Sequence, residues 1–320
     1  MEMRTDWNDL IKALQDPIFD RVLVACHRSP DGDAAGSAHA LAYALRKMGR
    51  KARVFCPDPF GKEFSYLTGE EEGIPPFEPT HFVTVDVAEP DMLCGAAFAD
   101  RIDICLDHHK NSRVQARYRF VDPTAASCGE IILEVIRALG IEPDAYLARA
   151  LYTAVATDTG CFRYSNTTEK TFLAAAYLSR FAEKNDFYKI NKAMFETKSR
   201  VRLLLEAEAA ENVSFASHGR IAYLAVTLER QKELNADYRE LDTMINVIRQ
   251  IEGVQVAMVA KEREPGVFKV SVRSEAPFDA SAFCAAFGGG GHVAAAGCTL
   301  NGTGEEVLSA LVEEGERRLS

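Results

Sequence analysis

The feature that most constrains the fold of this chain is an alternation of short apolar runs with helical stretches through its first half. Apolar runs occupy residues 21–26, 52–56, 81–87 and 102–106, and a helical stretch at 34–48 separates the first two. Continuous apolar runs of this length are typical of strands buried on both faces, and intervening helices favour a parallel sheet. We therefore predict an α/β fold whose N-terminal parallel sheet carries helices on both faces and binds ligands at the carboxyl ends of its strands.

The rest of the chain shows mainly helical patterns first and strand-like apolar runs afterwards. Helical patterns cover 128–139, 144–157 and 168–179, a charged helical stretch follows at 196–210, and later apolar runs at 221–226, 254–260 and 268–272 indicate strands. Thr303 and Glu306 form a capping-box pattern before a final helix. We predict an N-terminal domain over 1–195, a helical linker over 196–210, and a smaller C-terminal α/β domain with a mixed sheet over 211–320.

Charge and composition narrow the class of protein. Lys and Arg total 37 against 47 Asp and Glu, which gives a formal net charge of −10. An acidic chain argues against sequence-independent binding of long duplex nucleic acid, which normally requires a basic face. The chain shows neither a run long and apolar enough for a membrane span nor a basic-then-apolar leader, and its eight cysteines form no CxxC pair. We expect a cytoplasmic protein that does not bind membranes.

Chemically competent side chains follow three of the predicted strands. His27, Asp31 and Asp33 come after the first strand, Asp86 ends the third, and Asp107-His108-His109 follows the fourth. Each has a plain structural alternative: Asp33 as a helix cap, Asp86 as a strand terminus, and the histidines as a surface pair. The carboxyl ends of parallel strands meet at one edge, so we expect these side chains to converge.

A further carboxylate, Asp158, ends a predicted helix, where a simple turn residue is the alternative. Together the set offers imidazole nitrogens and carboxylate oxygens around two positions. Mixed ligation of this kind suits two divalent ions, with Mn²⁺ the leading candidate and Mg²⁺, Fe²⁺, Co²⁺ or Zn²⁺ as alternatives. Two such ions can activate water and stabilise an in-line phosphoryl displacement. The residues alone do not choose between His108 and His109 as the ligand.

Three features outside this set could bind an anion. Gly288–Gly291 precedes His292, and glycines allow backbone N–H groups to approach an anion closely. Arg273-Ser274, at the end of a predicted strand, could hold a phosphate through the planar guanidinium. The helix N-terminus near Ser127 could also favour a phosphate. A flexible loop, a solvated strand end and ordinary capping are the respective alternatives.

The motifs resemble those of the DHH phosphoesterase family, which is named after the tripeptide at Asp107–His109. His27–Asp33, Asp86 and Asp158 match the other motifs of the family, and the glycine run with His292 and Ala294-Ala-Ala-Gly297 is similar to its C-terminal DHHA1 domain. Length and domain pairing are similar to the NrnA-type members, which are bacterial oligoribonucleases that also dephosphorylate 3′-phosphoadenosine 5′-phosphate (pAp). The resemblance implies a homodimer and covers nearly the whole chain.

The resemblance also implies a role for each matching residue. One metal ion would be held by His27, Asp31 and Asp86, and the second by Asp33, Asp86, His108 and Asp158. Asp107 would orient the neighbouring imidazole, and His109 would contact the scissile phosphate or protonate the leaving oxygen. Recognition of the substrate's end, across an interdomain cleft, would fall to Arg273, Ser274, Gly289, Gly290, Gly291 and His292.

These inferences predict a Mn²⁺-dependent phosphoesterase that hydrolyses short oligoribonucleotides to mononucleotides and converts pAp to AMP. A phosphodiesterase of cyclic or linear dinucleotides is the enzymatic alternative. A non-catalytic nucleotide-binding protein would be expected to lack a metal ligand, and every expected position is filled here.

Overall fold

The computed structural model describes residues 6–71 and 73–319, which divide between two compact units, residues 1–197 and 198–320. The first unit contains, in chain order, α1 (Trp7–Gln15), β1 (Arg21–Ala25), α2 (Gly32–Lys47), β2 (Lys51–Phe55), α3 (Ser65–Thr68), β3 (His81–Val85), η3 (Pro90–Leu93), β4 (Ile104–Asp107), β5 (Tyr118–Val121), α4 (Cys128–Ala138), α5 (Ala145–Asp158), α6 (Glu169–Leu178) and α7 (Asp186–Asn191). The second contains α8 (Arg200–Asn212), β6 (Ser214–Ala216), β7 (Ile221–Val226), α9 (Leu228–Glu233), α10 (Asp242–Ile248), β8 (Val256–Glu264), β9 (Val267–Ser274), α11 (Ala280–Ala285), β10 (Gly290–His292), β11 (Ala295–Asn301) and α12 (Gly304–Leu319).

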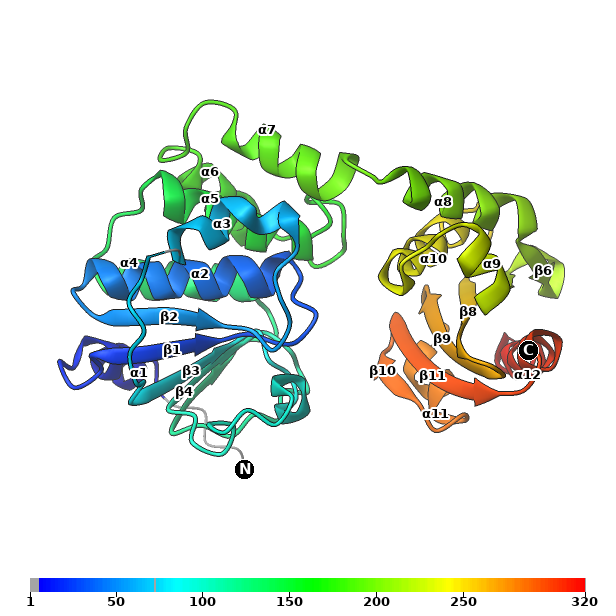
Figure 1. The fold of residues 1–320 in the computed structure, drawn as a ribbon, viewed down its shortest axis with the longest axis horizontal. Helices are drawn as coiled ribbons and strands as arrows, with labels where there is room; N and C mark the ends of the chain where they lie inside the picture. Colours follow the sequence, from blue (N-terminus) through cyan, green and yellow to red (C-terminus); the bar gives the residue numbers. More distant parts are fainter. Residues whose placement is uncertain (1–5, 72, 320) are drawn as a thin grey trace. The chain divides into compact units, whose positions relative to one another are not determined.

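The sheet of the first unit has five strands in the order β2-β1-β3-β4-β5, and every neighbouring pair is parallel. Its arrows therefore point the same way in Figure 1. The strand order reverses at β1, because β2 lies on one side of it and β3 on the other. In doubly wound sheets such a reversal opens a crevice at the carboxyl ends of the two central strands. The predicted fold class is confirmed, and this topology places the crevice between β1 and β3.

The two faces of this sheet are covered differently. Val24, Val83 and Leu106 belong to a large core cluster that also contains the buried residues of α2, α4 and α5, and Figure 1 shows α2 and α4 lying along this face. On the other face, Ala25 and Phe82 pack under η3 and the chain between β3 and β5. Residues of successive strand positions thus alternate between two apolar layers, which is why these strands are apolar throughout.

Glycines inside the helices allow three helices of the first unit to pack at short range. A Cβ atom on Gly36 of α2 would lie 2.3 Å from the carbonyl oxygen of Ala150 in α5, and one on Gly129 of α4 would lie 2.4 Å from Cβ of Ala154. Any larger side chain would push α2, α4 and α5 apart. The close packing fixes the first turns of α2 and α4 and the last turn of α5 relative to one another.

The second unit is built around a mixed six-stranded sheet in the order β10-β11-β9-β8-β7-β6. One face packs against α11 and α12 through residues such as Phe283 and Leu311. The other packs against α8 and α10 through residues such as Leu205 and Ile245. The segment predicted as a helical linker, 196–210, contains most of α8, and the side chains of Leu205 and Ala209 are buried in the core of this unit.

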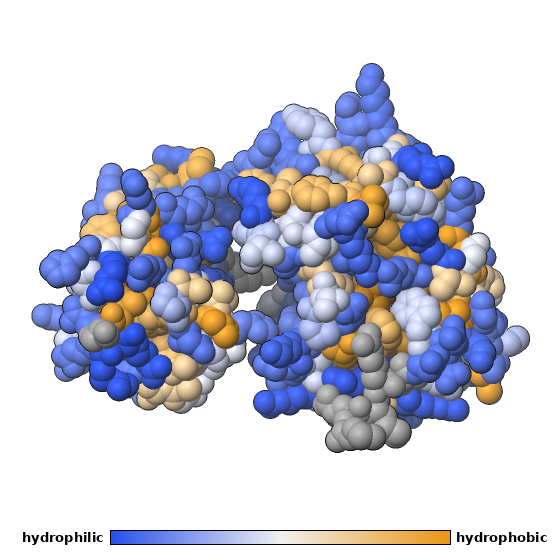
Figure 2. All heavy atoms as spheres, turned by 180° about the vertical axis from the view of Figure 1, so that it is seen from behind, coloured by the Kyte–Doolittle hydropathy of each residue, from blue (hydrophilic) through white to orange (hydrophobic). Residues whose placement is uncertain are grey.

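Among the helices formed by residues 6–71 and 73–319, none has both the length and the apolar character needed to cross a membrane. On the face drawn in Figure 2, hydrophilic residues predominate and hydrophobic ones form small scattered groups.

Candidate metal centre

The loop between β1 and α2 carries His27 and Asp31, and Asp33 follows in the first turn of α2. Nδ1–H of His27 donates to the carbonyl oxygen of Arg28 at 2.7 Å, which fixes the ring and leaves Nε2 directed at carboxylates. Nε2 lies 3.8 Å from Oδ1 of Asp31 and 3.6 Å from Oδ2 of Asp86. Asp31 is also the N-cap of α2, because Oδ1 accepts the N–H of Ala34 at 3.0 Å. A backbone acceptor that orients an imidazole in this way is common behind metal-bound histidines.

Asp86 occupies the position directly after β3 and adopts a left-handed backbone conformation, with φ of 57°. Its N–H donates to the carbonyl oxygen of Leu106 in β4 at 3.0 Å, so the strand ladder holds this residue in place. The residue is only 2% exposed, yet its Oδ1 has no hydrogen-bond partner among residues 6–71 and 73–319. That oxygen lies 3.6 Å from both Nε2 of His108 and Nδ1 of His109. A buried, unpartnered carboxylate oxygen is costly unless another group satisfies it.

In the Asp-His-His tripeptide at the end of β4, the two imidazoles contact different groups. Oδ1 of the fully buried Asp107 accepts the backbone N–H groups of His108 and His109 at 2.8 and 3.2 Å, and Nδ1–H of His109 at 2.8 Å. Burial opposes the charged imidazole, but the hydrogen bond to Asp107 and the charges of Asp107, Asp86 and Asp158 together outweigh it and raise the pKa of His109 to about 9. Nε2 of His108 instead faces three carboxylates: Asp158 at 3.5 Å, Asp86 at 3.6 Å and Asp33 at 3.8 Å.

Asp33 is held by the helix that follows β5. Its Oδ2 accepts the N–H of Cys128 at 2.6 Å, and its Oδ1 accepts the N–H of Gly129 at 2.9 Å and the hydroxyl of Ser37 at 3.0 Å. The N-terminus of α4, considered from the sequence as a phosphate site near Ser127, therefore binds a carboxylate of the protein itself. The positive end of the helix dipole favours such a carboxylate.

The electrostatics of this cluster are unfavourable without a cation. Burial, reinforced by the charges of Asp86, Asp158 and Asp31, raises the pKa of Asp33 well above its ordinary value. Burial is also the main cause that raises the pKa of Asp158 to about 7, with Asp86 and Asp31 adding to it. Carboxylates gathered this closely either take up protons or share a cation.

The donor atoms fit two divalent ions. One group consists of His27, Asp31 and Asp86, and another of Asp33, His108 and Asp158; within each group the ligand atoms lie within 4.8 Å of one another. The nitrogen–oxygen distances of 3.5–3.8 Å are too long for hydrogen bonds. They are within the roughly 4.2 Å that can separate two atoms bound to one ion at about 2.1 Å. Asp86 joins the groups, since its two oxygens face His27 and His108 respectively.

A third possible group, Asp86 with His108 and His109, overlaps the other two. In it Nδ1 of His109 already donates to Asp107, so this nitrogen carries its proton and its lone pair is not available to an ion. The geometry therefore favours His108 as the ligand, a choice that the residues alone left open.

The residues predicted to recognise the substrate lie in the second unit on β9 and at β10, the two strands that flank β11. β11 pairs with β9 so that Ala295 faces Arg273, and β10, which contains Gly290 and His292, pairs with β11. The hydroxyl of Ser274 lies 3.0 Å from the carbonyl oxygens of both Phe278 and Val293, so it supports the surrounding loops.

Packing explains some of the glycines in the run from Gly288 to Gly291 but not all of them. A Cβ atom on Gly289 would lie 2.2 Å from the carbonyl oxygen of Gly297, and one on Gly291 would lie 2.6 Å from that of Ala295. Packing within the sheet requires glycine at both positions. At Gly290, which is exposed, a Cβ atom would meet nothing within 4 Å. Of these three glycines, only Gly290 is not required by packing.

Two contributors to the site escaped the sequence analysis. The backbone N–H groups of Cys128 and Gly129 hold Asp33, and Nδ2 of Asn166 donates to the carbonyl oxygens of Asp158 and Ala126 at 3.1 and 2.9 Å. The first could have been suspected from the Ser127-x-x-Glu130 capping pattern. No local pattern marks Asn166, because its role depends on contacts between distant segments.

Comparison with known proteins gives an independent view of the whole chain. Residues 21–157 match the DHH family, N-terminal domain, and residues 218–320 match the DHHA1 domain. The bifunctional oligoribonuclease and PAP phosphatase NrnA of Thermus thermophilus is 33% identical over 96% of this chain and 92% of its own length.

Two more distant similarities extend this result. The cyclic-di-AMP phosphodiesterase PdeA of Listeria monocytogenes is 26% identical over 96% of this chain, which corresponds to 48% of that protein. Among solved structures, an exopolyphosphatase-related protein from Bacteroides fragilis superimposes with a TM-score of 0.87 at 22% identity, over 97% of this chain and 95% of that one. This last likeness concerns the fold.

Proposed function

Since the chain belongs to the DHH family and ends in a DHHA1 domain, we propose that it hydrolyses short oligoribonucleotides to mononucleotides and dephosphorylates pAp to AMP. The observation that carries the proposal is the meeting of two ligand groups at the buried Asp86. Phosphoester hydrolysis is a reaction that paired divalent ions catalyse widely.

We assign one ion to His27, Asp31 and Asp86, and a second to Asp33, Asp86, His108 and Asp158. When bound, the pair would lower the pKa of a water molecule and offset the negative charge that develops on the phosphoryl oxygens. Oxygen and imidazole donors suit Mn²⁺ best among the ions considered, and Mg²⁺, Fe²⁺, Co²⁺ and Zn²⁺ are the comparison ions for a test.

The protein's own groups supply the proton. Asp107 fixes His109 in the tautomer or charge state that carries a proton on Nδ1 and stabilises the imidazolium form. In this state Nε2 of His109 can donate to a phosphoryl oxygen or protonate the leaving oxygen. General acid catalysis by a positioned imidazole contributes typically about 10²–10⁴-fold to a rate.

Substrate recognition is assigned to the second unit. The guanidinium of Arg273 provides planar donors for a phosphate, and the exposed backbone at Gly290 together with His292 provides close polar contacts. We include Ser274, Gly289 and Gly291 as residues that shape this surface. An acidic chain whose local positive charge comes from bound ions suits a short substrate better than a long duplex.

A substrate panel tests the proposal. Purified protein with Mn²⁺ is incubated with pAp, RNA of two to five nucleotides, longer RNA, cyclic and linear dinucleotides, and pyrophosphate; Asp86→Asn serves as the inactive control. We expect AMP from pAp and mononucleotides from the short RNA. Turnover of pyrophosphate or long RNA alone would contradict the proposal, and so would full activity in the Asp86→Asn protein.

The similarity to PdeA supports a second candidate, hydrolysis of cyclic or linear dinucleotides of adenosine or guanosine. In the same panel this candidate predicts faster turnover of a dinucleotide than of pAp. Binding of pAp and dinucleotides without turnover would instead favour a non-catalytic nucleotide-binding protein.

We also propose that the protein is a homodimer. In each chain a catalytic domain over 1–195 would be joined through the helical segment 196–210, whose helix α8 packs into the core of the second unit, to a substrate-binding domain over 211–320. Large apolar side chains lie exposed on α6, with Phe172 57% and Leu173 61% exposed. Light scattering coupled to gel filtration measures the mass directly, and a monomer at micromolar concentration would contradict the dimer.

A further inference from the structure

The loop that carries His27 and Asp31 contains a strained residue at its centre. Ser29 has φ of 51°, in the left-handed region that non-glycine residues rarely adopt. It is exposed, so burial of its own side chain does not hold it there. Some other contact must stabilise this conformation, because a relaxed Ser29 would redirect the chain between the two ligands.

Asp58 makes that contact. Its Oδ2 accepts both the backbone N–H of Ser29 at 2.8 Å and the hydroxyl of Ser29 at 3.2 Å. Two donors of one residue converging on one carboxylate oxygen fix the orientation of both its backbone and its side chain. Hydrogen bonds to a charged acceptor are stronger than those between neutral groups.

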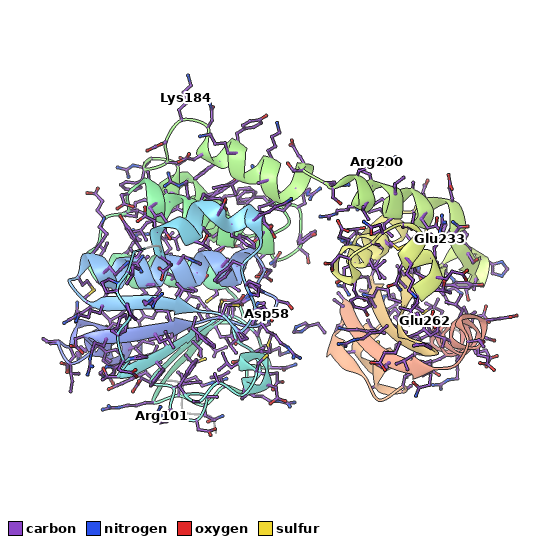
Figure 3. The ribbon with its side chains drawn as sticks, in the orientation of Figure 1. Asp58, Arg101, Lys184, Arg200, Glu233 and Glu262 are labelled. Atoms are coloured by element: carbon purple, nitrogen blue, oxygen red, sulfur yellow. The ribbon has the colours of Figure 1, made fainter. Side chains whose placement is uncertain are left out.

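The sheet topology brings Asp58 to this position. β1 and β2 run parallel with Ala25 opposite Phe55, so the loops that follow them leave the sheet side by side. Figure 3 shows Asp58 at the end of the sheet toward which the strand arrows point. A second contact joins the same loops, since Sγ–H of Cys56 donates to the carbonyl oxygen of His27 at 3.2 Å.

We propose that Asp58 is a positioning residue that holds the loop from His27 to Asp31 in the conformation needed for both side chains to share one ion. Asp58 is not itself in any of the ligand groups found among the described residues. It acts through Ser29, which lies two residues from each ligand. The inference rests on the proposed function, in which these two residues bind a divalent ion.

The test compares three variants with the wild-type protein. Asp58→Ala removes both hydrogen bonds, and Asp58→Asn keeps an acceptor oxygen without the charge. Glu306→Ala is the matched control, because Oε2 of Glu306 accepts the N–H and the hydroxyl of Thr303 in the same way at the start of α12. Mn²⁺ binding to metal-stripped protein is measured by titration calorimetry, circular dichroism checks the fold, and pAp hydrolysis is followed as a function of Mn²⁺ concentration.

We expect Asp58→Ala to weaken binding of one Mn²⁺ by about 10–100-fold, the range typical for residues that orient metal ligands. Hydrolysis should fall at limiting Mn²⁺ and recover at high Mn²⁺, Asp58→Asn should lie between this variant and the wild type, and Glu306→Ala should bind Mn²⁺ normally. Wild-type Mn²⁺ affinity in a folded Asp58→Ala protein would overturn the positioning role alone. A wild-type protein that binds no Mn²⁺ would overturn the proposed function and this role with it, whereas a Mn²⁺-binding wild-type protein that does not hydrolyse the panel would overturn only the proposed reaction.

Discussion

Asp86 is the residue whose substitution tests the metal centre most sharply. Its two oxygens face His27 and His108, which belong to different ligand groups, so Asp86→Asn should weaken both ions. Asp31 belongs only to the first group. Asp31→Asn should therefore weaken one ion, and asparagine can still cap α2 in place of the aspartate.

The expected magnitude follows from linkage between binding and folding. An ion present at about 100 times its Kd stabilises the folded state by about 2.7 kcal/mol. For a unit of 197 residues each kcal/mol corresponds to about 2–4 °C in Tm. One ion should thus raise Tm by about 5–11 °C, and two independent ions by about twice as much. A 100-fold loss of affinity leaves about 0.4 kcal/mol, or about 1–2 °C per ion.

Differential scanning fluorimetry measures these shifts with EDTA and with about 1 mM Mn²⁺. The wild type should show the full shift, Asp31→Asn about half of it, and Asp86→Asn almost none. Equal shifts in Asp86→Asn and wild type would refute the assignment of Asp86 to both ions. Loss of the whole shift in Asp31→Asn would refute the division into two groups.

Three further predictions concern the proton donor, the pH dependence of the metal-stripped protein and the glycine run. His109→Gln should lower the turnover of pAp by about 10²–10⁴-fold while calorimetric Mn²⁺ binding stays at the wild-type level, and loss of Mn²⁺ binding would instead identify His109 as a ligand. Metal-stripped protein should lose about 3 kcal/mol of stability in EDTA between about pH 6.5 and pH 8.5, because the folded-state pKa of His109 is about 9 and that of Asp158 about 7, both above their ordinary values. The stability contributed by His109 is complete only below its ordinary pKa near 6.5 and declines toward pH 9, and that contributed by Asp158 is lost as its proton leaves through pH 7. Thermal unfolding measured across this pH range tests the predicted decrease, and a flatter profile is expected in Mn²⁺. A rise of stability with pH would contradict the reasoning. Gly290→Ala should leave Tm within about 1 °C of the wild type and raise KM for pAp several-fold. Gly289→Ala should instead lower Tm, because its Cβ would lie 2.2 Å from the carbonyl oxygen of Gly297.

The architecture divides into a part that local patterns predicted and a part that they missed. The apolar runs at 21–26, 52–56, 81–87 and 102–106 correspond to β1–β4, because a strand buried on both faces leaves an unbroken apolar signature. The strands β5, β6, β10 and β11 went unpredicted. Their residues alternate little and owe their extended conformation to pairing with a neighbouring strand.

The convergence of these side chains was also predictable from the sequence. A run of His27, Asp31 and Asp33 beside a strand end, with Asp86 and Asp107–His109 at two other strand ends, predicts convergence because parallel strands end at one edge. Which imidazole faces the carboxylates was not readable. That choice depends on Asp107, whose Oδ1 accepts a hydrogen bond from Nδ1–H of His109, whereas Nε2 of His108 faces Asp33, Asp86 and Asp158.

The sequence by itself determined which residues could bind metal ions and at which edge of the sheet they would gather. Tertiary structure alone decided how they are held: Asp33 by the N–H groups of Cys128 and Gly129, and the strained Ser29 by Asp58. The physical reason is the separation along the sequence over which each interaction acts. Helix and strand periodicities act over neighbouring residues, whereas the contact between Asp33 and Cys128 joins positions 95 residues apart and exists only once α2 and α4 have packed.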